Sequence, residues 1–228
     1  NYSSSKDVWV DRKKWVPFNK GGGYRKWYGN QEYVIAFDQE NRDVLKTVGN
    51  KLPSENYYFR RAISWSDVNT STCSFRYYQE GFLFSHTGLC LFPEEDELNI
   101  LLAYLNTPFV DEISKVLNPT IHFPVGYLKQ LPYPKKLSAK KEEINHIVTN
   151  LIKYSKMDWD RQETSWGFTV NQLVECAKNG VSKISDSLSR VLDAHEVLLD
   201  DFTRKEIELN KIFYDIYCLE CSAGYDYA

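Results

Sequence analysis

The chain has 228 residues, of which 43% are hydrophobic and 15% aromatic, and a formal net charge of −3 at pH 7. This size and composition suit one large folded domain, or a domain with a helical appendage, and exclude a disordered protein. No apolar run reaches the ~20 residues that a membrane span needs, and nothing resembles a signal peptide. The five scattered cysteines argue against a disulfide framework and fit a reducing compartment, so we expect a cytoplasmic protein.

Charge is distributed unevenly along the chain. Residues 1–92 carry a net charge of +4, whereas residues 93–228 carry −7. The first part is therefore the better candidate for a surface that meets a polyanion. A second stretch without acidic residues runs from Ile113 to Lys141 and also contains several lysines.

A basic, aromatic and glycine-rich segment, residues 15–30, lies near the start of the chain; we call it the glycine block. Gly21, Gly22 and Gly23 allow the backbone to come close to another molecule. Residues suited to phosphate or to bases surround them: Lys20, Tyr24, Arg25, Lys26, Trp27, Tyr28 and Asn30. We expect the three cations to contact the phosphate backbone of a nucleic acid. Of the two rings at 27 and 28, one should lie in the core instead.

Short strands and loops are predicted for residues 8–92. Aromatic and β-branched runs predict strands at 33–37, 57–59, 75–78 and 82–84, and the polar segment 38–54 is predicted to be a loop. Further candidate nucleic-acid contacts in this part are Arg60, Arg61, Ser64, Ser66, Asn69 and Arg76. Neighbours on a strand point to opposite faces, so at most one of the two adjacent arginines should reach a groove. The polar run 64–74 fits an ordinary surface loop equally well.

Helical periodicity begins after Pro93. Leucines three or four residues apart predict a helix that ends near Leu105, and Thr107 should cap a second helix beginning at Pro108. The second helix should bury Ile113, Val116 and Leu117 and stop before Pro119. Prolines should keep residues 120–134 extended. The predicted fold class is therefore α+β, with a mostly antiparallel β domain carrying inserted helices at residues 1–135.

A C-terminal helical region is predicted for residues 136–228. Ser138 should cap a helix with an apolar stripe, formed by Ile144, Ile147, Val148, Leu151 and Ile152. A connector containing Trp159 and Trp166 follows. A last helix, capped by Ser185 or Asp186, carries an apolar heptad seam over a length on the order of 50 Å. That seam predicts packing along another helix.

Patterns typical of catalysis are missing from the sequence. It contains neither a P-loop nor the Asn/Asp-Pro-Pro-aromatic loop that holds a flipped adenine, and the nearest strings are Asn118-Pro-Thr-Ile121 and Leu131-Pro-Tyr-Pro134. The acidic run from Glu94 to Glu97 fits a helix start better than a magnesium site. Cys218 and Cys221 form a lone CxxC motif without the further ligands of a zinc site. We therefore expect no catalytic residue, cofactor or metal here.

Short motifs in a fixed order carry a resemblance over nearly the whole chain. They include Asn19-Lys-Gly-Gly22, Arg25-Lys-Trp-Tyr-Gly-Asn30, Phe59-Arg-Arg-Ala-Ile-Ser-Trp-Ser66, Leu101-Leu-Ala-Tyr-Leu-Asn106, Gly126-Tyr-Leu-Lys-Gln-Leu-Pro132 and Met157-Asp-Trp-Asp160. This series resembles the C-terminal half of PglX-type adenine-specific DNA methyltransferases of BREX phage-defence systems, which are related to fused restriction-modification enzymes. The chain departs from the family pattern at Gly167 and after Tyr217.

The resemblance implies a target-recognition region. Since the chain does not begin with Met, we expect a piece of a longer protein, although processing would also explain the missing Met. In that protein a preceding methyltransferase domain would bind S-adenosylmethionine and flip the adenine, while this region grips double-stranded DNA. Expected partners are DNA, that domain and other defence-system subunits. An alternative is a protein-interaction module that docks partner subunits through its C-terminal helices.

Overall fold

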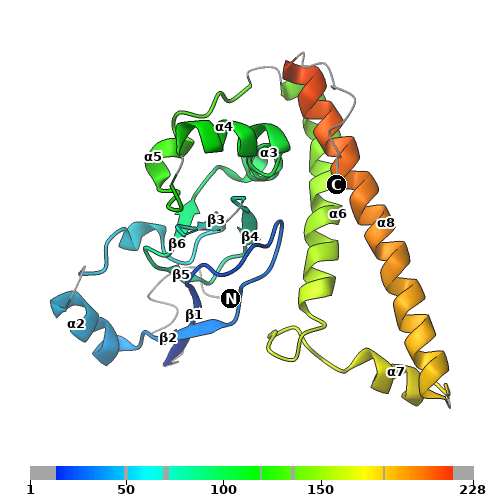
Figure 1. Ribbon diagram of the computed structural model, residues 1–228. Helices are drawn as coiled ribbons and strands as arrows, with labels where there is room; N and C mark the ends of the chain where they lie inside the picture. The colour runs from blue at the N-terminus through cyan, green and yellow to red at the C-terminus, as the bar shows by residue number, and fades with distance from the viewer. Residues whose placement is uncertain are drawn as a thin grey trace.

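The structure, a computed structural model, describes residues 14–48, 51–68, 72–118, 120–134, 137–181 and 183–217. A small body of strands and short helices lies beside two long antiparallel helices, α6 and α8 (Figure 1). The α+β class predicted from the sequence is confirmed.

Two three-stranded sheets form the centre of the body. The first has the order β2-β1-β5, from β1 (Trp15–Asn19), β2 (Tyr33–Ala36) and β5 (Leu83–Phe84). The second has the order β4-β3-β6, from β3 (Ala62–Ser66), β4 (Arg76–Tyr78) and β6 (Gly88–Leu91). Only the β1–β5 pairing is parallel among these named strands, so the mostly antiparallel prediction is confirmed.

The segment between β2 and β3 differs most from the sequence prediction. Helix α2 (Gln39–Thr47) occupies the predicted loop, and the Asp38 side chain caps it by accepting from the Asn41 amide. None of its residues is fully buried, and Val44 and Leu45 are its only apolar residues, too few for the stripe by which a helix is recognised. The predicted strand at 57–59 is wrong, because a 3₁₀ turn, η1 (Glu55–Tyr57), is followed by Phe59 with a φ of 66°.

Helices α3 (Glu95–Leu105) and α4 (Pro108–Leu117) confirm the two helices predicted after Pro93. The Thr107 hydroxyl accepts from the Val110 amide at 3.3 Å, as a capping residue should. Val116, predicted to be buried, is 83% exposed, because α4 turns a different face to the core. A short helix, α5 (Val125–Leu128), interrupts the segment predicted to be extended.

The helical region contains η2 (Ser138–Lys140), α6 (Lys141–Trp159), α7 (Gln172–Lys178) and α8 (Ile184–Tyr217). The predicted stripe of α6 is buried from Ile144 to Leu151. Against α6 packs the C-terminal half of α8, through Leu209, Ile212 and Phe213. In the N-terminal half of α8, Leu188 of the predicted seam is exposed, and so is Leu192, which is not a seam residue.

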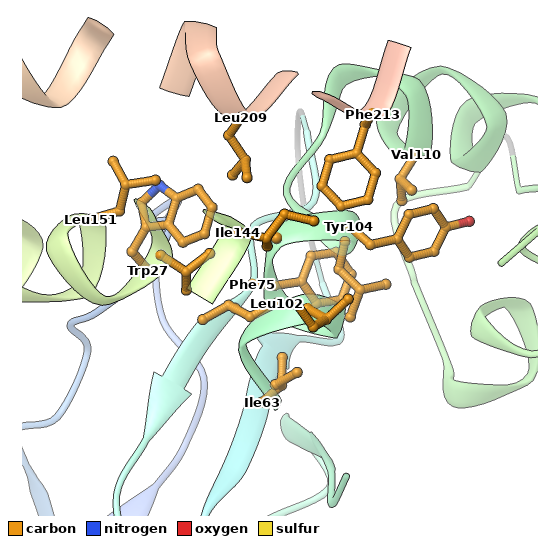
Figure 2. Close-up of a cluster of buried hydrophobic side chains, with 14 of the residues drawn as sticks. Trp27, Ile63, Phe75, Leu102, Tyr104, Val110, Ile144, Leu151, Leu209 and Phe213 are labelled. Carbon is orange, nitrogen blue, oxygen red and sulfur yellow. The ribbon is translucent and has the colours of Figure 1, made fainter. Parts of the chain in front are cut away.

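One hydrophobic core crosses the predicted domain boundary at residue 135. Figure 2 shows Trp27, Ile63 and Phe75 from the first part beside Ile144 and Leu209 from the helices. Each large side chain buried in this way contributes about 1.5–3 kcal/mol to stability. The β-rich body and the long helices therefore support each other, and the division into two domains stays a prediction.

Candidate nucleic-acid interface

The glycine block begins with strand β1, which ends at Asn19. The buried Asn19 side chain fixes the turn that follows. Its Nδ2 donates to the Ser64 hydroxyl at 2.6 Å, and its Oδ1 accepts from the Gly21 amide at 3.0 Å. Gly21 has a φ of +78°, and a Cβ there would lie 2.6 Å from the Thr87 carbonyl oxygen. Gly22 has a φ of +143°. Both positions therefore require glycine for backbone reasons.

A buried polar cluster lies beneath the three glycines. The Ser66 hydroxyl accepts from the Gly22 amide at 3.0 Å and donates to the Gly22 carbonyl at 2.7 Å. Arg76 Nη2 donates to the same hydroxyl at 2.8 Å, and Arg76 Nη1 donates to the Gly23 carbonyl at 3.2 Å. These bonds hold the loop onto strands β3 and β4.

Arg76 is a buried cation, with 0% of its surface exposed. Desolvation lowers the pKa of its guanidinium, which nevertheless stays charged at neutral pH. Among the described residues, no carboxylate pairs with it, and its Nε has no hydrogen-bond partner. A positive charge without an acidic partner therefore lies directly under the glycines.

Residues 25–30 of the block, which we call the inner segment, face the protein. The Arg25 guanidinium pairs with Asp158 of α6 and lies 5.0 Å from the centre of the Trp159 ring. Lys26 Nζ lies 3.8 Å from Glu206 of α8. These two predicted phosphate contacts thus fasten the block to the long helices.

Both large rings of the inner segment are buried, whereas one was expected to be. Trp27 is 1% exposed and Tyr28 is 6% exposed. The Trp27 indole Nε1 donates to Glu206 Oε1 at 2.7 Å. Asn30 is half-buried, and its Nδ2 donates to the Gly23 carbonyl at 2.9 Å. Neither ring offers a face on which a base could stack.

Residues 20–24, the outer segment, face solvent except for the buried Gly21. Lys20, Gly22, Gly23 and Tyr24 are exposed, and Tyr24 reaches 57%. Lys20 Nζ lies 5.4 Å from the centre of the Tyr33 ring, which is itself exposed. The predicted DNA-contacting residues are therefore divided between a surface group and an anchoring group.

The remaining predicted contacts are divided in the same way. Arg60 is exposed and lies 5.5 Å from the centre of the Tyr57 ring. Arg61 pairs with Glu80 and Glu95, and the bond to Glu95 raises the pKa of its guanidinium. Ser64 and Ser66 are buried, so they support the loop and are not available for base edges. Asn69 lies outside the described residues.

Groups that could perform chemistry are scarce in the described part of the chain. No three His, Cys, Asp or Glu side chains gather there as metal ligands would. Burial raises the pKa of the Cys73 thiol to about 12 and that of Cys90 to about 12, so neither is a nucleophile at neutral pH. Cys218 and Cys221 lie outside the described residues. None of the described helices combines the length and apolar character of a membrane span.

Sequence reasoning missed the residues that hold the block in place. Asp158 and Glu206, which receive Arg25 and Lys26, lie 133 and 180 positions further along the chain. Asn19 gave a weak signal, as a polar residue between a strand and a glycine turn. Nothing in a local pattern pairs it with Ser64.

Known proteins similar to this chain are adenine-specific methyltransferases, although no protein-family model matches it. The chain is 32% identical, over 89% of its length, to the adenine-specific methyltransferase BrxX of Escherichia coli O9:H4 (strain HS). It is 34% identical, over 91% of its length, to the adenine-specific methyltransferase PglX of Lacticaseibacillus casei (strain Zhang). The chain is thus homologous to one segment of PglX/BrxX proteins, which confirms the resemblance. It spans 16% and 18% of the lengths of these two relatives.

Proposed function

We propose that this chain is the DNA target-recognition part of an adenine-specific methyltransferase of a phage-defence system, of the BREX or restriction-modification kind. Its homology to PglX/BrxX proteins supports the methyltransferase context. In this proposal the chain grips double-stranded DNA, and a separate domain binds S-adenosylmethionine and methylates the adenine.

The outer segment carries the proposal of DNA contact. It combines an exposed cation at Lys20, exposed backbone at Gly22 and Gly23, and an exposed ring at Tyr24. The sequence has no acidic residue from Arg12 to Asn30, so no carboxylate of the block itself repels phosphate. A cation, accessible backbone and an aromatic ring on one loop form a suitable contact for a nucleic-acid strand.

Salt-dependent binding of duplex DNA tests this proposal. Fluorescence anisotropy with the intact chain should show an affinity that falls linearly with salt on logarithmic axes. The double change Lys20→Ala and Tyr24→Ala should weaken binding and reduce the slope by about one, because one phosphate contact is lost. Lys153→Ala, which removes an exposed lysine of α6, is the matched control and should bind like the wild type. No binding by the wild type at low salt would overturn the proposal.

A second candidate function, docking of a partner protein, is favoured by the N-terminal half of α8. There Ile184 is 80% exposed, Leu192 is 56% exposed and Leu199 is 53% exposed. Exposed apolar side chains on one helix favour contact with another protein. Changing all three to Gln in the parent protein should disrupt assembly and spare DNA binding. If assembly were unchanged, this second function would be excluded.

A further inference from the structure

Two consecutive peptide groups of the outer segment turn their carbonyl oxygens inward. The Gly22 oxygen accepts from the Ser66 hydroxyl at 2.7 Å, and the Gly23 oxygen accepts from Asn30 Nδ2 at 2.9 Å and Arg76 Nη1 at 3.2 Å. The described peptide bonds are trans, and in a trans peptide the N–H points opposite to the C=O. The amides of Gly23 and Tyr24 therefore point away from the buried cluster, toward the exposed side.

These two amides are unlike their neighbours. Within the described structure, neither donates a hydrogen bond. The amides on either side donate into the protein: the Gly22 N–H donates to the Ser66 hydroxyl and the Arg25 N–H to the Ser74 hydroxyl, each at 3.0 Å. The loop thus presents two adjacent backbone donors outward, between two amides that donate into the protein.

Arg76 strengthens one of these donors from beneath. Its guanidinium donates to the Gly23 carbonyl, which belongs to the same peptide group as the Tyr24 N–H. A charged donor on the carbonyl polarises that peptide and makes its N–H a better donor. Because no described carboxylate balances Arg76, an anion bound above the loop would offset part of the cost of burying this charge.

Gly23 differs from the two glycines before it. Its φ lies outside the left-handed range, and a Cβ added there would meet no atom within 4 Å. The fold therefore does not require glycine at this position. Open space beside two outward amides fits a position at which a ligand approaches the backbone.

We propose that the amides of Gly23 and Tyr24 bind one phosphate group of the DNA backbone, with Arg76 beneath it and Lys20 on the same loop. Adjacent backbone N–H groups that converge on one side of a turn form a concave site suited to an oxyanion. This inference rests on the proposed function and adds a specific phosphate subsite to it. In that subsite, backbone N–H groups contact the phosphate, because the Arg25 and Lys26 side chains pair with carboxylates of the long helices.

Matched aspartate substitutions test the site in the intact chain. Gly23→Asp places a carboxylate beside the two amides. Gly126→Asp is the control, because Gly126 also has open space at its Cβ and a φ outside the left-handed range. The probes are inorganic phosphate, followed by backbone amide chemical shifts, and a DNA duplex, followed by anisotropy.

In the wild type and in Gly126→Asp, phosphate should shift the amides of Gly23 and Tyr24. Gly23→Asp should abolish this shift at Tyr24, weaken duplex binding about tenfold at low salt and reduce the salt slope by about one. Both variants should unfold at the wild-type denaturant concentration.

The phosphate subsite would be wrong, and the proposed function would stand, if both variants bound the duplex as the wild type does. If phosphate shifted these amides but the wild type bound no duplex, the proposed function would fail, and the site would serve a free phosphate ligand instead. Absence of phosphate-induced shifts in the wild type would also overturn the subsite.

Discussion

The outer and inner segments of the glycine block share a composition and have opposite environments. Both combine cations with aromatic rings, yet Lys20 and Tyr24 face solvent, while Lys26 and Trp27 contact the core and α8. The difference arises because Asp158 and Glu206 on the long helices provide partners for the inner cations. In this block, basic and aromatic residues therefore support the proposed DNA contact only where no distant carboxylate receives them.

The largest expected effect is the loss of stability on removing the Trp27 side chain. Trp27→Ala should lower the free energy of unfolding by about 3–5 kcal/mol, because it leaves a cavity where β4, α6 and α8 meet. Denaturant unfolding measures this loss. Tyr24→Ala, which removes a ring from the outer segment, is the control and should change stability by no more than about 0.5 kcal/mol. Similar losses for both variants would remove the distinction between the segments.

A smaller loss is expected at the hydroxyl that joins the loop to Arg76. Ser66→Ala should cost about 1–3 kcal/mol, since it leaves the Gly22 amide and one guanidinium nitrogen without their partner. The same change should weaken duplex binding, because the outer segment loses its support. Unaltered stability together with unaltered DNA binding would show that the buried cluster does not position the loop.

The inner segment also predicts a dependence of stability on alkaline pH. Burial raises the pKa of the Tyr28 phenol from 10.0 to about 12. Since the folded state holds this proton more tightly, the phenol contributes stability below about pH 10 that is lost as the pH rises toward 12. Urea unfolding of Tyr28→Phe should therefore show a weaker decline over this range than the wild type. If the stabilities of the wild type and Tyr28→Phe declined in parallel, the Tyr28 phenol would be exposed to water in the folded state.

The smallest effect on stability is expected at the ion pair between Arg25 and Asp158. Asp158→Asn should cost about 0–1 kcal/mol, because both side chains are partly exposed and water screens the pair. It should strengthen duplex binding at low salt, since it removes a negative charge and releases Arg25. If binding became weaker instead, the pair would have a positioning role at the interface.

Much of the helical architecture could be predicted from local patterns. The Thr107 cap and the apolar stripe from Ile144 to Leu151 each depend on residues within a few turns of one another. Helix α2 escaped prediction because it buries none of its residues. The extended prediction at 57–59 failed because Phe59 has a left-handed φ, which aromatic composition does not reveal.

The candidate segment could be chosen from the sequence, but its internal division could not. Three glycines with basic and aromatic neighbours set residues 20–30 apart, yet only Lys20, Gly22, Gly23 and Tyr24 are exposed, and residues 25–30 face the protein. Whether Lys20 or Lys26 faces solvent depends on Glu206 on α8, and whether Arg76 is a contact or a support depends on Ser66 across the sheet. Such pairings are set by tertiary packing and leave no local pattern.

Mapping duplex DNA onto the backbone amides of the intact chain tests the central claim most directly. The account predicts chemical-shift changes concentrated in residues 20–24, centred on Gly23 and Tyr24, with little change in residues 26–28. Changes confined to the inner segment, or to helices α6 and α8 alone, would contradict it.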